Sequence, residues 1–243
     1  MSNVTPQNCH ACFAFSTFVV LYAWASSDGI EYLFFNDASS TTGSGSDVQW
    51  VQLLRGVHDL LKCYFFWLED GPLKGLLNLG NDNAKSMAEA SSEDSSRFAA
   101  LEELWEKAPT PFATSEVDSL QETLNRLKET YALLFSLDGA DAVSAVLSWP
   151  VLVPEAYIQL LKKRQPEALV LLAHYCLLLN RIDDFWWMRG MSRHLLQTIH
   201  RTIGKEWESW INWPLQDLVL SEFRNQVEKD EIKYGLPSRS IDL

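Results

Sequence analysis

Cysteine and histidine are the side chains in this sequence that most readily do chemistry, so their spacing is the first test for a site. Cys9, His10 and Cys12 have the spacing of metal ligands, but a structural zinc site needs four ligands and the sequence has no second pair. Cys63 and Cys176 stand alone in apolar stretches, which is typical of buried thiols. The sequence therefore predicts no metal site and no zinc in this segment.

Motifs for nucleophilic or metal-assisted catalysis do not occur. The chain lacks a Gly-x-Ser-x-Gly turn and a His-Glu-x-x-His pair, and the glycines within 42–46 lack the lysine of a phosphate-binding loop. Asp183 and Asp184 resemble an acidic magnesium motif, but no second carboxylate set stands near them. They are better suited to cap a helix that carries residues 185–187. We expect no catalytic residue and no enzyme activity.

The acidity of the chain limits the partners that it can bind. Its 243 residues contain 20 Lys and Arg against 32 Asp and Glu, a formal charge of −12. Such a surface repels a phosphate backbone, so we expect no direct nucleic-acid binding. No Lys or Arg precedes Arg55, and the most apolar stretch, 11–25, is shorter than the roughly 20 residues of a membrane span. We therefore predict neither a signal peptide nor a membrane span.

Apolar residues recur at helical spacing along most of the sequence. The stretch 8–25 is apolar on both faces, which is typical of a buried helix. The stretch 168–179 is nearly all apolar and should be the most buried element, with Pro166 near its start. Period-two alternation is confined to a short piece near 31–35. These patterns predict an all-α fold.

The helices are expected to form a single irregular multi-helix domain over residues 1–214, followed by a C-terminal helical extension or tail over 215–243. Residues 81–122 carry ten acids and three bases. Within them, the Ser-rich run 91–96 adds low complexity. We predict an acidic surface insertion at about 80–96.

Tryptophan is unusually frequent, with ten in the chain. Such aromatic residues either fill a core or line a cavity for a large apolar ligand. If a cavity exists, we place its wall on the central helix and on the turn that follows, because a Trp pair offers broad apolar faces with two N–H donors, and a glycine permits close approach. The predicted ligand-binding residues are His174, Tyr175, Trp186, Trp187 and Gly190; the alternative for His174 is a satisfied core histidine.

An ordered series of motifs indicates a family. In sequence order they are Asn8 with 11–16, 50–56, 71–73, Tyr131 with 134–135, Trp149-Pro150, 163–169, 172–175, 185–190 and 210–214. From about Asn8 to Pro214 the chain resembles the C-terminal regulatory domain of fungal Zn(II)2Cys6 transcription factors of the sterol uptake control type. The six-cysteine zinc cluster that binds DNA in this family is absent from this chain.

The resemblance implies a non-enzymatic, ligand-sensing regulatory domain that controls RNA polymerase II transcription. It implies a sterol or other lipid as ligand and no cofactor, with transcriptional co-regulators or a cytosolic retention partner. The expected location is the nucleus, with the cytoplasm as the alternative for the ligand-bound form. The family's helices before the Asn8 region are missing, so the helix at 8–25 should expose one apolar face. The rival hypothesis is a helical protein-interaction module with a solid core and no small-molecule ligand.

Overall fold

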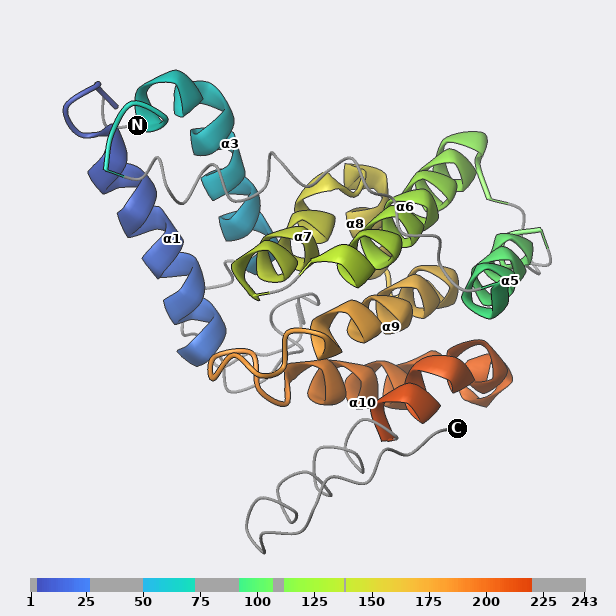
Figure 1. Cartoon of the computed structure of the whole chain (residues 1–243). Coiled ribbons are helices and arrows are strands. Elements are labelled where there is room, and N and C mark those ends of the chain that lie inside the picture. Colours follow the sequence, from blue (N-terminus) through green and yellow to red (C-terminus); the bar gives the residue numbers. More distant parts are fainter. Residues whose placement is uncertain (1–3, 27–49, 73–91, 107–111, 138, 220–243) are drawn as a thin grey trace, which may run out of the picture.

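Every regular element in the described part of the chain is a helix, which confirms the predicted all-α class (Figure 1). The computed structural model describes residues 4–26, 50–72, 92–106, 112–137 and 139–219. The α-helices are α1 (Cys9–Ser26), α3 (Trp50–Leu68), α5 (Ser92–Ala100), α6 (Thr114–Leu133), α7 (Gly139–Leu152), α8 (Glu155–Lys162), α9 (Pro166–Asn180) and α10 (Met191–Ile203). Shorter 3-10 helices are η2 (Leu101–Glu103), η3 (Leu134–Ser136) and η4 (Lys205–Ile211).

Several predicted segments lie wholly or partly outside the described residues. The extended piece near 31–35 is one of them, as are residues 80–91 of the predicted acidic insertion and 220–243 of the predicted tail. The remaining residues of the insertion, 92–96, form the start of α5. The boundary between 1–214 and 215–243 stays a prediction.

Helix α9 is the centre of the fold. Pro166 occupies its first turn, where the missing N–H costs nothing, and every residue from Glu167 to Leu179 is buried. A helix that is apolar on all sides must be surrounded, and α9 packs against α6, α8, α10 and η4. Figure 1 shows it lying between α6 and α10. The prediction that 168–179 is the most buried element is confirmed.

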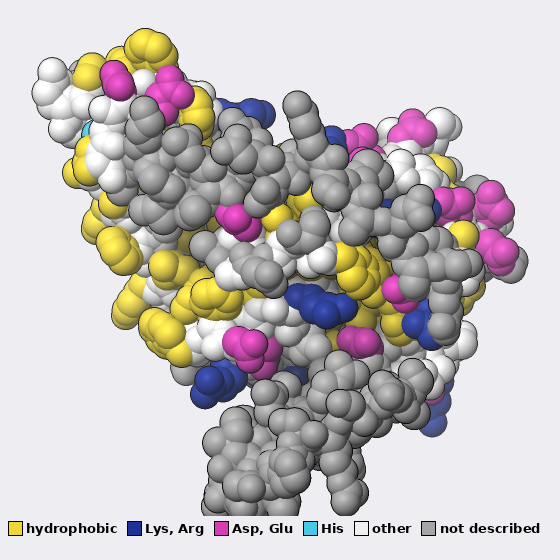
Figure 2. Space-filling model, viewed as in Figure 1, with side chains coloured by type: hydrophobic (Ala, Val, Ile, Leu, Met, Phe, Trp, Pro, Cys, Tyr) yellow, Lys and Arg dark blue, Asp and Glu magenta, His cyan; other side chains and the backbone are white. Residues whose placement is uncertain are grey.

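Helices α1 and α3 pack against each other at one side of this bundle, and α3 joins the pair to α7 (Figure 1). At one end of the pair the His10 ring lies against Gly71, where a Cβ atom would come within 2.1 Å of the imidazole. Although α1 is apolar all round, it is not buried all round. One of its faces is exposed, and hydrophobic side chains line that edge of the molecule in Figure 2.

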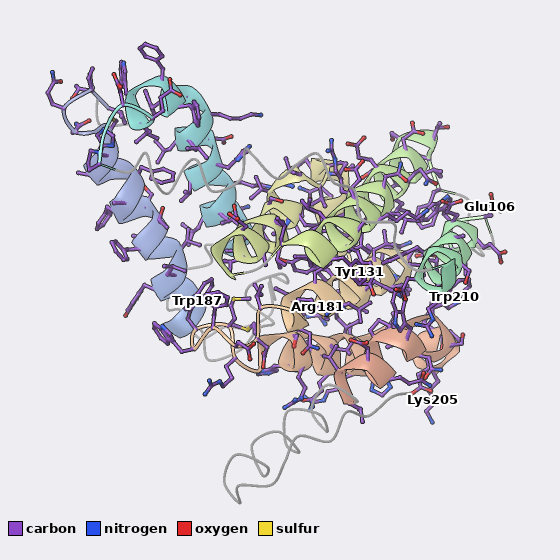
Figure 3. The ribbon with its side chains drawn as sticks, in the orientation of Figure 1. Glu106, Tyr131, Arg181, Trp187, Lys205 and Trp210 are labelled. Carbon is purple, nitrogen blue, oxygen red and sulfur yellow. The ribbon has the colours of Figure 1, made fainter. Side chains whose placement is uncertain are left out.

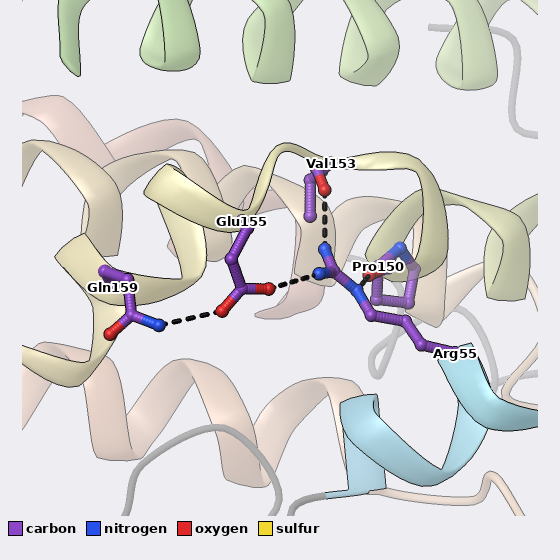
Figure 4. Close-up of polar contacts among 5 residues, drawn as sticks. All are labelled: Arg55, Pro150, Val153, Glu155 and Gln159. Atoms are coloured by element: carbon purple, nitrogen blue, oxygen red, sulfur yellow. Dashed lines mark hydrogen bonds and ion pairs between the residues drawn. The ribbon is translucent and has the colours of Figure 1, made fainter. Parts of the chain in front are cut away.

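An arginine from α3 stabilises the corner between α7 and α8 (Figure 4). In a continuous helix the Pro150 carbonyl would accept the N–H of residue 154, but that residue is a proline and has no N–H. Arg55 supplies the missing donor: its Nε lies 3.3 Å from the Pro150 oxygen and its Nη2 lies 2.5 Å from the Val153 oxygen. Its Nη1 also pairs with Glu155 at 2.7 Å. These contacts of Arg55 connect the α1–α3 pair to the corner between α7 and α8.

We predict that Arg55→Ala lowers the free energy of unfolding by about 2–3 kcal/mol, because two carbonyls at a largely buried corner lose their donor. The matched control is Glu155→Ala, which removes the exposed ion pair and the exposed hydrogen bond that Gln159 donates to the same carboxylate, and should cost about 1 kcal/mol or less. Chemical denaturation of both variants measures the difference. Equal losses in the two variants would show that the ion pair, and not the carbonyl contacts, holds the corner.

Candidate ligand-sensing site

The predicted residues His174 and Tyr175 are neighbours on α9 but belong to different aromatic clusters. Tyr175 stacks on Trp149, with ring centroids 4.4 Å apart, and its hydroxyl donates to the Val146 carbonyl at 3.2 Å. The Tyr157 ring is T-shaped to the same indole, with ring centroids 5.8 Å apart. All three rings are buried, and burial raises the pKa of the Tyr175 hydroxyl well above its usual value. This cluster joins α7, α8 and α9 and has the character of a core.

His174 contributes to a second cluster, which we call the aromatic box: Tyr131, His174 and Trp213. The His174 ring lies 5.6 Å from the Trp213 ring. Its Nδ1 lies 2.9 Å from the Val170 carbonyl, and since a carbonyl only accepts, Nδ1 carries the proton. Burial lowers the pKa of His174 to about 4, so the ring is neutral at physiological pH.

Phe98 of α5 fills the aromatic box. Its ring is T-shaped to the rings of Tyr131 and Trp213, with ring centroids 5.1 Å apart in each case. Only 3% of Phe98 is exposed. The Tyr131 hydroxyl donates to Asp94 at 3.3 Å, and the Arg97 guanidinium lies 5.1 Å from the Trp213 ring centroid. Burial and the nearby Asp94 carboxylate raise the pKa of Tyr131 to about 12. One turn of α5 thus attaches this helix to the core.

The remaining predicted residues lie in the turn between α9 and α10, away from the aromatic box. Figure 3 shows Trp187 in this turn, at the opposite end of α10 from Trp210. Trp186 is 78% exposed, whereas Trp187 is partly buried and packs near Phe185 with ring centroids 6.2 Å apart. The prediction that a helix carries residues 185–187 is wrong, because the chain forms successive turns there.

Gly190 and Asp183 fix the shape of this turn. Gly190 has φ +77°, a left-handed conformation that favours glycine, and its N–H donates to Asp183 Oδ1 at 2.6 Å. A Cβ atom at Gly190 would meet nothing within 4 Å. No protein atom therefore requires a glycine here by close approach; the backbone conformation requires it, and the approach of a ligand stays a prediction.

The structure thus divides the five predicted residues among three places: His174 in the aromatic box, Tyr175 in the Trp149 cluster, and Trp186, Trp187 and Gly190 in the α9–α10 turn. Their role in binding a ligand stays a prediction. Sequence reasoning missed Phe98, the residue that fills the box. The only signal for it was a single large apolar side chain in a polar helix.

Two further properties concern metals and membranes. Within the described ranges, no group of three or more His, Cys, Asp or Glu is placed to hold a metal ion. Over the same residues, no single helix has both the length and the apolar character needed to cross a membrane. One pair, Asp141–Leu152 with Glu155–Lys162, meets that test only when joined across an 80° bend.

Comparison with known proteins gives one informative similarity. The chain is 21% identical over 226 residues to a Zn(2)-C6 fungal-type transcription factor of Gibberella zeae, which covers 90% of this chain and 44% of that protein. The chain therefore spans less than half the length of this relative. The similarity supports the general family of fungal Zn(2)-C6 transcription factors, but it does not test the sterol uptake subtype. No family model and no solved structure matches the chain.

The buried His174 predicts a measurable pH dependence of stability. Its pKa is about 4 in the folded chain against an ordinary value of 6.5, so the unfolded chain takes up the proton first as the pH falls. Stability should therefore decrease between about pH 6.5 and pH 4, by about 3 kcal/mol when complete. Urea unfolding at pH 7 and pH 5 measures the larger part of this loss, because pH 5 still lies above the pKa of the folded chain. His174→Leu should flatten the slope, and His194→Leu, on the exposed face of α10, should retain it. A slope unchanged in His174→Leu would contradict the assignment.

Proposed function

We propose that this chain is a non-enzymatic regulatory region of a fungal transcription factor and acts in the nucleus through protein contacts and not through DNA. The observation that carries the proposal is the similarity to a Zn(2)-C6 fungal-type transcription factor along 90% of the chain. The all-α architecture and the ordered motifs agree with that family. The formal charge of −12 disfavours contact with a phosphate backbone, so DNA recognition would belong to another part of such a protein.

A finer part of the proposal is that the region senses a sterol or other lipid. The α9–α10 turn supports it, because Trp186 presents a largely exposed indole beside the partly buried Trp187. Exposed tryptophan is uncommon on a soluble surface, and an amphipathic ring is suited to contact a flat lipid that carries one hydroxyl. A ligand that binds one packing of the turn more tightly would increase the population of that packing. It would thereby change the surface that the turn presents to partner proteins.

The alternative is a protein-interaction module with a filled core. The tight packing of Tyr175 on Trp149 and of Phe98 in the aromatic box favours it, because these rings already have aromatic neighbours. In that case the chain would regulate transcription through co-regulators alone. The two hypotheses differ in whether a lipid binds, and not in the class of protein.

Reporter transcription tests the regulatory role. We expect that the whole chain, fused to an unrelated sequence-specific DNA-binding domain in a fungal cell, changes reporter transcription relative to that domain alone. The matched control is the same fusion carrying Leu171→Asp, which places a charge inside buried α9 and should abolish the effect by unfolding the region. An intact, well-expressed fusion that leaves transcription unchanged would contradict the proposal.

Lipid co-purification tests the ligand. We expect mass spectrometry to find a sterol or other lipid bound to the purified chain. Trp186→Ala should lose it with little change in melting temperature, because the indole is mostly exposed. Phe66→Ala is the matched control, since Phe66 is 77% exposed but lies on α3, and it should retain the lipid. A wild-type chain that binds no lipid would leave the interaction module as the better hypothesis.

A further inference from the structure

The exposed face of α1 is a continuous apolar stripe. Ala11, Phe15, Phe18 and Tyr22 are all exposed, and the three aromatic residues are 70%, 68% and 74% exposed, respectively. Positions 11, 15, 18 and 22 fall on one side of a helix because their spacing follows the helical repeat. Figure 2 shows hydrophobic side chains gathered along this edge of the molecule. We call these four residues the α1 stripe. Three large aromatics side by side exceed the scattered apolar exposure that is normal for a surface.

The charge distribution restricts what can cover this stripe. Helix α1 contains no Asp, Glu, Lys or Arg in its 18 residues, although the whole chain carries a formal charge of −12. Two copies of so acidic a chain repel each other over most of their surfaces. Along α1 a second copy meets no charge of its own sign. This helix is therefore a place where like chains can approach without losing solvation of charged groups.

The spacing of the stripe is self-complementary. The intervals between its members are four, three and four residues, which read the same in both directions. If two α1 helices lie antiparallel across a two-fold axis, Phe15 of one faces Phe18 of the other, and the small Ala11 faces the large Tyr22. Small-against-large pairing at the ends and aromatic pairing at the centre fill such a contact without overlap. A two-fold axis makes each contact twice, as in most homodimers.

We propose that the α1 stripe is the dimerisation surface of this protein, occupied by α1 of a second copy in antiparallel orientation. Three aromatic side chains of about 200 Å² each, about 70% exposed, offer roughly 400 Å² per copy. A standard interface uses about 800 Å² per partner, so the dimer is weak and its formation depends on protein concentration. The proposal concerns self-association and does not require that the chain regulates transcription or binds lipid.

Sedimentation velocity of the whole chain, under reducing conditions, tests the surface. The wild type should shift from monomer to dimer as its concentration rises from about 5 to about 200 µM, where a weak dimer with a micromolar dissociation constant forms. Phe18→Glu should weaken self-association at least about tenfold, because it places a charge at the centre of the stripe. Phe66→Glu, at an equally exposed phenylalanine on α3, should dimerise like the wild type. Circular dichroism at each concentration shows whether the variants remain folded.

A mixing experiment tests the antiparallel register. Phe15→Lys and Phe18→Glu should each be monomeric alone, since each homodimer would pair a charge with a phenylalanine twice. In a mixture, Lys from one chain faces Glu from the other and the second contact remains Phe against Phe, so heterodimers should form. A wild type that stays monomeric to about 200 µM, a Phe18→Glu variant that dimerises normally, or a mixture without heterodimers would overturn the proposal.

Discussion

The fold depends on the burial of one helix that has no polar face. Because α9 must be shielded on every side, α6, α8, α10 and η4 are arranged around it. The same requirement brings polar side chains into the interior, where each needs a partner. The Tyr175 hydroxyl donates to the Val146 carbonyl, and His174 donates to a carbonyl one turn earlier on its own helix. The aromatic clusters are thus consequences of how α9 is enclosed.

One acidic group enters this interior at the start of α9. Glu167 is buried in the first turn, and its Oε2 has no hydrogen-bond partner in the described part of the structure. Burial raises the pKa of the Glu167 carboxyl, which favours the protonated form, while a hydrogen bond to its own backbone N–H favours the ionised form. At the junction between α8 and α9, burial therefore outweighs the opposing effect of the backbone hydrogen bond.

Local patterns predicted the helices well, whereas contacts between distant residues could not be predicted. The apolar run after Pro166 was sufficient to identify α9 as the most buried helix. The role of Arg55 could not be read from its own surroundings, because it follows from a missing N–H about a hundred residues away, at Pro154. Asp183 and Asp184 suggested the cap of a helix over residues 185–187, but Asp183 instead accepts the Gly190 N–H, and the left-handed backbone of Gly190 belongs to a turn.

The insertion of Phe98 into the aromatic box has a consequence for any molecule that would enter there. Phe98 is covalently connected to Tyr131 and Trp213, the rings that it contacts. Any ligand for the box must therefore compete with a side chain of the same molecule, whose effective concentration is about millimolar when the connection is short. This concentration does not fall when the protein is diluted. An aromatic or lipid group from solution therefore occupies the box only if its intrinsic affinity exceeds that of Phe98 by enough to overcome this advantage.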